Sequence, residues 1–262
     1  MFDNFLPIIA LEACHMTDIS GDGKNFLLAF AVASTENSEF WKTFLEKLNL
    51  SLDLMHRDSL VILSDREKGI ANAISTIIPM AFHSYCVFHI EKNIKTKFRT
   101  DVDGLIWKIA KANSILDFNV AMCDLRRKNN IVYDYLAEIN PVHWARAHFP
   151  VPRFGHVTSN IAESMNSWFG TIRKEVPFKI LYAIMNKLTD QLVTYQQMYE
   201  NIHNPISSKL QSILNANYTK GRSLQTKRVQ GSKSSSVQYD VGSDLYRIVD
   251  INTKTCSCGI PR

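Results

Sequence analysis

Short apolar runs alternate with amphipathic segments in the first part of the chain. Three runs have the length and unbroken apolar character of buried strands: Leu6–Leu11 (LPIIAL), Phe26–Ala33 (FLLAFAVA) and Leu60–Leu63 (LVIL). A helix capped by Asn37 or Ser38 follows the second run, and a helix stopped by Pro79 follows the third, because apolar residues recur there at helical spacing. This order of elements predicts an α/β layer with parallel or mixed strands.

Polar segments separate these elements, and the pattern then changes. Thr17–Asn25 (TDISGDGKN) lies between the first two apolar runs and is typical of a turn. Beyond Ala81 the spacing becomes helical from Cys86 to about Ile139, and Pro141–Pro152 follows as an irregular loop.

Two more helices are predicted in the second half of the chain. Thr158 or Ser159 caps the first, and Pro177 opens the longest helix of the chain. The apolar stripe of this long helix comprises Phe178, Leu181, Met185, Leu188, Leu192 and Tyr195. Past Asn217, a basic linker precedes two short strands, Val237–Tyr239 and Tyr246–Val249.

The patterns define an α/β core that is interrupted by helices and followed by a small appendix. The predicted parts are the first part of the core (1–85), a helical insertion (86–157), the second part with closing helices (158–217), a basic linker (218–236) and the appendix (237–262).

Composition narrows the class of protein. The chain has 262 residues, of which 45% are hydrophobic and 21% charged, so it can build one large core or two modest ones. No apolar run reaches the roughly 18 residues that a membrane span needs, and the first residues do not resemble a secretory signal. Five scattered cysteines suit a reducing compartment.

The excess positive charge is concentrated in one segment. Lys and Arg number 30 against 25 Asp and Glu, and residues 218–233 contain five bases and no acid: Lys220, Arg222, Lys227, Arg228 and Lys233. A basic segment of this kind neutralises nucleic-acid phosphates without reading sequence. A solvated linker whose charges only maintain solubility is the alternative.

Three carboxylates stand where a metal site could form. Asp65 follows a buried strand, at the sheet edge where open α/β folds build their sites. Glu12 ends the first strand and would lie beside Asp65 if the two strands are neighbours, and Glu163 on a helix is the natural third ligand for Mg²⁺ or Mn²⁺. The alternatives are a helix N-cap at Ser64 or Asp65, worth about 1 kcal/mol, and a solvated face for Glu163.

Two cysteine motifs suggest metal chemistry but lack a full ligand set. Cys86 and His89 lie one helical turn apart, with His83 just before them, whereas a structural zinc site needs four ligands. A buried thiol beside a hydrogen-bonded histidine is the alternative. Cys256 and Cys258 would be half of a Zn²⁺ site, since no Cys or His follows them in this sequence.

Three segments together resemble the Mutator-like element (MULE) transposases of eukaryotes. VILSDREKGIANA, which contains Asp65, resembles the segment with the family's second catalytic Asp. HSYCVFHIEKN, with Cys86 and His89, is similar to the family's Cys–His signature, and TSNIAESMN resembles the segment with its catalytic Glu, here Glu163. Cys256-Ser-Cys258 looks like the start of a SWIM-type zinc finger. The three core segments occur in the family's order, and the resemblance extends over about residues 6–262.

The resemblance implies an RNase H-like fold, with a helical insertion before the catalytic Glu. It implies that Asp65, Glu163 and Glu12 bind two divalent metals, Mg²⁺ or Mn²⁺, and that the ancestral enzyme cut DNA at transposon ends and joined the 3′-hydroxyl to a target. It also implies a nuclear location and DNA as the partner, with no membrane partner. A homo-oligomer is compatible with these expectations, but the sequence leaves the oligomeric state open.

The sequence departs from the family pattern in ways that predict an impaired enzyme. Glu12 stands where the family has Asp, and its extra methylene moves the carboxylate by about 1.5 Å when extended, against a tolerance of about 0.5 Å. The segment after Met16 is too short for the family's next strand, which predicts a sheet lacking one strand. The zinc finger stops after two cysteines, and no DNA-reading domain precedes the first strand.

We therefore expect a remnant with little or no catalysis. The alternative is a DNA-binding transcription regulator of the far-red-impaired-response type, which resembles the same transposases and would bind promoter DNA without transposition.

Overall fold

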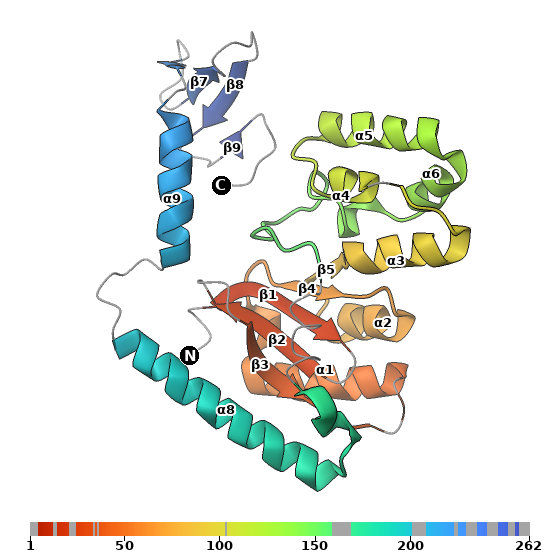
Figure 1. Cartoon of the computed structure of the whole chain (residues 1–262), viewed down its shortest axis with the longest axis vertical. Helices are drawn as coiled ribbons and strands as arrows, with labels where there is room; N and C mark the ends of the chain where they lie inside the picture. Colours follow the sequence, from red (N-terminus) through yellow and green to blue (C-terminus); the bar gives the residue numbers. More distant parts are fainter. Residues whose placement is uncertain are drawn as a thin grey trace. The chain divides into compact units, whose positions relative to one another are not determined.

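The computed structural model divides the chain into two compact units (Figure 1). One unit comprises residues 1–81 and 159–213, and the other comprises residues 82–158 and 214–262. The structure describes residues 5–12, 15–20, 25–33, 35, 37–102, 104–158, 169–200, 208–222, 225–228, 235–239, 246–250 and 255–256. The predicted helix that begins at Thr158 or Ser159 therefore lies almost wholly outside the described residues.

A mixed sheet forms the centre of the first unit. Its strands are β1 (Phe5–Glu12), β2 (His15–Ser20), β3 (Asn25–Phe30) and β4 (Val61–Ser64). The sheet order is β3-β2-β1-β4-β5, with β5 at Phe82–Tyr85. β1 runs parallel to β4 and antiparallel to β2, which confirms the mixed α/β layer predicted from the sequence.

The prediction of a missing strand is wrong. Residues 15–20 form β2, which pairs antiparallel with β1 on one side and with β3 on the other. Its sequence, HMTDIS, gave no strand signal because it is short and polar. Pairing with two apolar neighbours nevertheless satisfies its backbone groups, and such tertiary context overrides a weak local propensity. β1 therefore has hydrogen-bonded partners on both sides.

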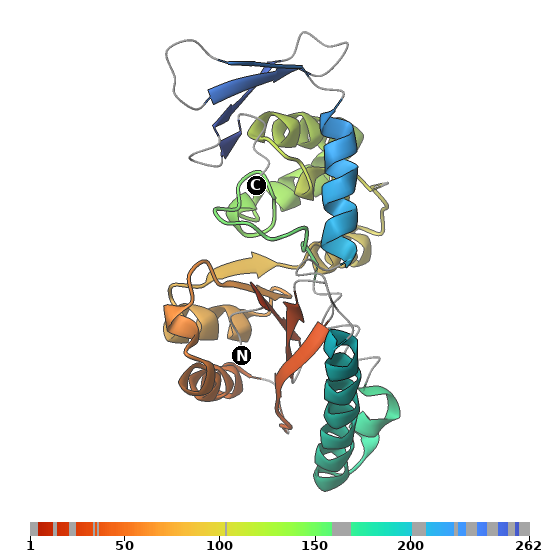
Figure 2. The same ribbon diagram turned by 90° about the vertical axis from the view of Figure 1, so that its left-hand side faces the viewer.

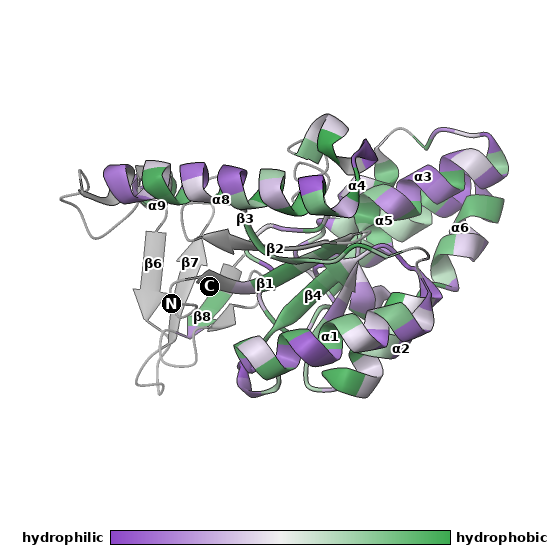
Figure 3. Ribbon diagram, turned by 90° about the horizontal axis from the view of Figure 1, so that it is seen from below, coloured by the Kyte–Doolittle hydropathy of each residue, from purple (hydrophilic) through white to green (hydrophobic). Residues whose placement is uncertain are grey.

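Helices cover both faces of this sheet. α1 (Ser38–Leu52) and α2 (Lys68–Ile77) lie on one face, and α8 (Pro177–Glu200) lies on the other (Figures 2 and 3). α1 begins as predicted, with the Asn37 Oδ1 accepting a hydrogen bond from the Phe40 N–H at 2.9 Å. The core under α1 and α2 joins strand residues to helix residues and includes Ile9, Leu11, Ile62, Trp41, Leu45, Ile70 and Ile74.

The predicted apolar stripe of α8 is mostly not its packed side. Ile184 is buried against Leu27 of β3, together with Phe169. Phe178 and Met185 from the predicted stripe are exposed, with 77% and 55% of their surfaces accessible. The helix is apolar over more than one face, so its spacing alone did not identify the side that meets the sheet.

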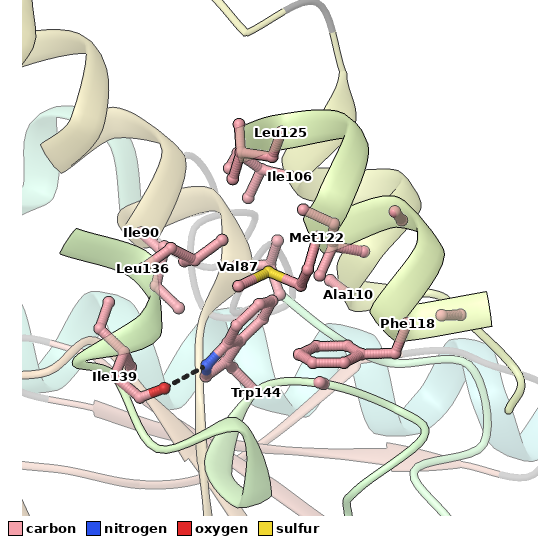
Figure 4. Close-up of a cluster of buried hydrophobic side chains, with 14 of the residues drawn as sticks. Val87, Ile90, Ile106, Ala110, Phe118, Met122, Leu125, Leu136, Ile139 and Trp144 are labelled. Atoms are coloured by element: carbon pink, nitrogen blue, oxygen red, sulfur yellow. Dashed lines mark hydrogen bonds between the residues drawn. The ribbon is translucent and has the colours of Figure 1, made fainter. Parts of the chain in front are cut away.

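Helices dominate the second unit, as the sequence predicts for this region. They are α3 (Val87–Phe98), α4 (Leu105–Ala110), α5 (Ile115–Lys128) and α6 (Asn130–Ala137), followed by a short 3₁₀ turn at Pro141–His143. Two further 3₁₀ turns, Leu54–His56 and Gly170–Lys174, belong to the first unit. Trp144 lies at the centre of the second unit's core, and its indole N–H donates to the Ile139 carbonyl at 3.1 Å (Figure 4).

The C-terminal segment holds α9 (Ser208–Gly221) and a four-stranded antiparallel sheet. Its strands are β6 (Gln225–Arg228), β7 (Ser235–Tyr239), β8 (Tyr246–Asp250) and β9 (Thr255–Cys256). The two strands predicted here are present as β7 and β8. The basic stretch is not a linker throughout, because it includes the end of α9 and β6, whose pairing with β7 uses the backbone and is insensitive to side-chain charge.

Replacing Thr17 by Pro tests the central position of β2. Thr17 pairs with Ala10 of β1 and with Leu27 of β3, so a residue without an N–H breaks the ladder of a strand that has two neighbours. We expect Thr17→Pro to abolish cooperative urea unfolding of the chain, whereas the control Thr17→Val retains it. A cooperative transition of unchanged midpoint in Thr17→Pro would show that residues 15–20 are a loop.

Candidate functional site

The parallel strands β1 and β4 end at the same edge of the sheet, at Glu12 and just before Asp65. The parallel register pairs Ile8 with Val61 and Ala10 with Leu63. Extending this register by two residues along both strands, past Ala10 and Leu63, places the backbone of Glu12 beside that of Asp65. Neighbouring strands lie about 4.8 Å apart, so the two backbones are within reach of one shared ligand. The side chain of Glu12 lies outside the described residues.

Asp65 does not cap the helix that follows it. Helix α2 begins at Lys68, and its N-cap is Glu67, whose Oε2 accepts a hydrogen bond from the Ile70 N–H at 2.9 Å. Among the described residues, the carboxylate of half-buried Asp65 accepts only one long bond, 3.3 Å, from the Glu67 N–H to its Oδ1. The N-cap alternative for Asp65 is therefore wrong, because Arg66 and Glu67 separate Asp65 from the first residue of the helix.

The glycine of this segment has a packing role. A Cβ on Gly69 would lie 2.7 Å from the Glu67 Oε2 and 3.2 Å from the backbone nitrogen of Ser38, the first residue of α1. Any larger residue would displace the capping carboxylate or separate the starts of α1 and α2. In the short segment from Asp65 to Gly69, Glu67 caps the helix and Gly69 allows the starts of α1 and α2 to pack closely. The Asp65 carboxylate takes part in neither interaction.

The chemistry of Asp65 fits a hard divalent cation. Its carboxylate forms no ion pair with any cationic side chain in the described part of the chain, and carboxylate oxygens are the preferred ligands of Mg²⁺ and Mn²⁺. Within the described ranges, no three His, Cys, Asp or Glu side chains gather as a metal site. Glu163 lies outside those ranges, so its convergence with Asp65 stays a prediction.

The Cys–His segment occupies the start of α3. Cys86 is fully buried immediately before the helix, and His89 is half-buried one turn later. The adjacent Val87 N–H donates to the Val157 carbonyl at 3.0 Å, which fixes the start of α3 to the residue that precedes Thr158. The second segment of the resemblance is thus joined to the beginning of the third, while the pairing of Cys86 with His89 stays a prediction.

Sequence reasoning missed a polar cluster around β5. Arg153 is buried and donates from its Nη1 to the Ser84 Oγ and from its Nη2 to the Trp144 carbonyl, both at 3.1 Å. His143 donates from its Nδ1 to the His83 carbonyl at 2.9 Å. Four-residue β5 and the Pro-bounded loop have no periodicity, so no pattern could have revealed these contacts.

The structure describes only some of the basic and cysteine residues predicted to be functional in the C-terminal segment. Lys220 and Arg222 are exposed near the end of α9, and the Arg222 guanidinium lies 5.9 Å from the centre of the Tyr218 ring. Lys227 and Arg228 belong to β6, but their side chains lie outside the described residues, as does all of Lys233. The same holds for the Cys256 side chain and for Cys258, so the zinc prediction is untested.

The segment that contains Asp65 lies in a region of the chain that is similar to known proteins. Residues 9–93 match the MULE transposase domain. This match covers β1 to the first half of α3 and confirms the resemblance to that family for the part of the chain that contains Glu12, Asp65, Cys86 and His89. Among the described residues, none of the helices is long and apolar enough to cross a membrane.

Curated relatives of the chain are transposases of bacterial insertion sequences. The transposase for insertion sequence element IS905 of Lactococcus lactis is 31% identical over 101 residues, which are 36% of this chain and 25% of that protein. The transposase for IS256 in transposon Tn4001 of Staphylococcus aureus is 27% identical over 134 residues, 48% of this chain and 31% of that protein. The matched region thus spans a quarter to a third of each relative.

Stability measurements separate the role of Asp65 from that of Glu67. We expect Glu67→Ala to lower the free energy of unfolding by about 1 kcal/mol, because the α2 N-cap is lost. Asp65→Ala should change it by less than about 0.5 kcal/mol, since only the long Asx contact disappears. Urea unfolding of the two variants checks this. If Asp65→Ala is the more destabilising variant, Asp65 is the capping residue after all.

His83 predicts a dependence of stability on pH. Burial, with a smaller contribution from neighbouring His143, lowers the pKa of His83 to about 4. Because the folded pKa lies below the unfolded value of about 6.5, the folded state resists protonation. Stability from this group is complete above pH 6.5 and is lost as the pH falls towards 4, on the order of 3 kcal/mol in total.

Urea unfolding at pH 7, 5.5 and 4 measures this dependence. The variant His83→Gln should show a shallower loss between pH 6.5 and 4 than the unaltered chain. Equal pH profiles for the two proteins would contradict the assignment to His83.

Proposed function

We propose that this chain derives from a MULE transposase with an RNase H-like core, and that its sheet edge retains a weakened site for metal-dependent phosphoryl transfer on DNA. The observation that supports the proposal is the parallel pairing of β1 with β4, whose register, extended past Ala10 and Leu63, would set Glu12 beside Asp65. The cap formed by Glu67 adds support, because it leaves the Asp65 carboxylate available.

Asp65, Glu12 and Glu163 would hold Mg²⁺ or Mn²⁺ in this proposal. Bound divalent cations of this kind activate a water or a 3′-hydroxyl and stabilise the leaving oxygen of a phosphodiester. The protein's own part is to fix the ligands. The Glu67 N–H orients the Asp65 carboxylate, while the paired backbones of β1 and β4 set the separation of residues 12 and 65.

DNA is the partner in this proposal, and the bases of residues 218–233 would contact its phosphates. Lys220 and Arg222 are exposed and suited to this role. A nuclear location and a zinc site at Cys256 and Cys258, completed by ligands beyond this sequence, belong to the same proposal.

Two arguments for loss of activity came from the core sequence, and the structure removes one of them. β2 is present, so the sheet that supports β1 is complete on both sides. Glu12 remains, and its extra methylene should weaken metal binding rather than prevent it, since the register of β1 and β4, extended by two residues, would keep its backbone beside Asp65. The proposed enzyme is therefore impaired through one side chain.

Calorimetric titration with Mn²⁺ tests the proposal. We expect saturable binding by the unaltered chain and none by Asp65→Asn, which keeps the shape of the side chain but removes its charge. Asp58→Asn is a matched control, because Asp58 is exposed in a turn before β4. Glu12→Asp should bind Mn²⁺ about tenfold more tightly and should increase nicking of supercoiled DNA.

The same experiment can refute the proposal. A cooperatively folded chain that binds no Mn²⁺, or that binds it equally well as Asp65→Asn, has no metal site at this edge. Salt-sensitive DNA binding that persists in such a chain would favour the transcription-regulator alternative.

A further inference from the structure

Helix α8 has a second apolar side besides the one that packs in the first unit. Ile180, Ile184 and Leu188 form the packed side, which contacts Leu27 of β3. A second set of apolar side chains on the same helix is between 48% and 77% exposed: Phe178, Leu181, Tyr182, Met185, Leu192 and Val193. Together they present several hundred Å² of apolar surface, a size at which an exposed patch is often an interaction site.

The spacing along this second side is that of a helix that pairs with another helix. Five residues recur at alternating intervals of four and three, which is the heptad pattern of a coiled-coil seam: Phe178, Tyr182, Met185, Thr189 and Leu192. We call these five residues the α8 seam. Thr189 donates its Oγ1 hydroxyl to the Met185 carbonyl at 2.9 Å. Its hydroxyl is therefore satisfied inside the helix, and burial against a partner would leave no unmet hydrogen bond there.

Antiparallel pairing with a second copy of α8 would match large side chains with small ones. With a twofold axis beside Met185, Phe178 lies opposite Val193 of the second copy. Tyr182 lies opposite Thr189 in the same arrangement, so each ring meets a small side chain, as dense packing requires. In a parallel pair each side chain would meet its own counterpart instead. Phe178 and Tyr182 would then crowd their counterparts, while two Thr189 side chains would leave a gap.

The charges beside the seam also favour the antiparallel arrangement. Lys179 and Asp190 are exposed and lie on the same flank of the seam, since eleven residues are close to three helical turns. In an antiparallel pair centred on Met185, Lys179 of each copy lies within one turn of Asp190 of the other. In a parallel pair the two residues stay about 16 Å apart along the axis. The Lys179 Nζ lies 3.2 Å from the Glu175 Oε2 within the chain, but an exposed pair of this kind contributes little and does not hold the side chain in place.

The extent of this surface fits a twofold interface. A standard interface buries about 800 Å² on each partner, with an apolar centre and a polar rim. The seam, with Leu181 and Val193 beside it, supplies the centre, and the flank with Lys179 and Asp190 supplies the rim. A twofold axis uses the same surface on both copies, so each charge contact would form twice.

We propose that the α8 seam is a self-association surface, at which two copies of the chain pair their α8 helices antiparallel about a twofold axis near Met185. The occupant is a second copy because the seam is complementary to its own reversed image in both side-chain size and charge. Ile180, Ile184 and Leu188 keep their contacts within the chain in this arrangement. The proposal goes beyond the proposed function and requires neither the metal site nor DNA.

Sedimentation velocity of the full chain over the micromolar range tests the proposal. We expect a reversible equilibrium between monomer and dimer. Met185→Lys should abolish the dimer, because it places two ammonium groups face to face at the twofold axis. The variant should still fold, since Met185 is 55% exposed. Leu116→Lys is the matched control, because Leu116 is an apolar residue of α5 that is 71% exposed and gains the same charge. It should keep the dimer.

A charge exchange tests the antiparallel orientation. Lys179→Asp and Asp190→Lys should each raise the dissociation constant of the dimer roughly tenfold, because each brings like charges together twice in the dimer. The double variant should restore the affinity of the unaltered chain, since the two opposite charges face each other again. Both residues are exposed, so circular dichroism should be unchanged in all three variants.

Each outcome supports the proposal or overturns it. A chain that stays monomeric overturns it, and so does a dimer that survives Met185→Lys or that Leu116→Lys weakens equally. Loss of affinity in both single charge variants without recovery in the double variant overturns the antiparallel pairing. A monomer that binds phosphatidylcholine vesicles through Met185 assigns the surface to lipid instead. No metal or DNA enters these measurements, so their failure is distinct from a failure of the Mn²⁺ titration.

Discussion

The parallel pairing of β1 with β4 is the contact on which the candidate site depends. Both strands are buried on both faces: Ile8, Ile9, Ala10 and Leu11 are at most 1% exposed, and so are Val61 to Ser64. A slip of one residue would turn every side chain of a strand to the opposite face. Because α1 and α2 pack against Ile9, Leu11 and Ile62, the core permits only one register.

The register that the core fixes also determines where the candidate site residues lie. Asp65 lies outside the core, yet its expected place beside residue 12 follows from the apolar residues that precede the two positions in each strand. The N-cap of α2 also leaves Asp65 available, because Glu67 accepts the hydrogen bond at the helix start. The backbone positions of residues 12 and 65 are thus set by neighbours whose own roles are structural.

The helical unit is organised by polar contacts that join distant parts of its sequence. Trp144 is buried among α3, α4, α5 and α6 (Figure 4). Its carbonyl accepts a hydrogen bond from Arg153. Arg153 also binds Ser84, and Val87 binds Val157. These bonds fix residues 153–157 to β5 and α3, so the segment that enters the predicted Glu163 helix starts from a defined position.

Much of the fold could be predicted from residue patterns because its strands and helices are strongly apolar. The buried residues of α1 and α2 and the strand at Val61–Ser64 agree with the prediction. β2 could not be predicted, since its pairing depends on neighbours and not on its own polar residues. The packed side of α8 was also missed, because its apolar residues surround more than one face.

The candidate site was also predictable only in part, where a site residue adjoins a strongly apolar strand. Asp65 stands out because it ends a buried strand, but only the structure shows that Glu67 takes the capping role. Arg153 gave no signal, since a single arginine in an irregular loop follows no period. Its role depends on burial and on its bonds to Ser84 and Trp144, which are properties of the folded chain.

The most direct test of the central claim is paramagnetic broadening of backbone amide signals by Mn²⁺ in solution. If the carboxyl ends of β1 and β4 share one cation, substoichiometric Mn²⁺ should broaden the signals of residues 11–13 and 64–66 together, before those of residues 218–222. Broadening at only one of the two strand ends, or first at a distant acidic surface, would contradict a shared site at this edge.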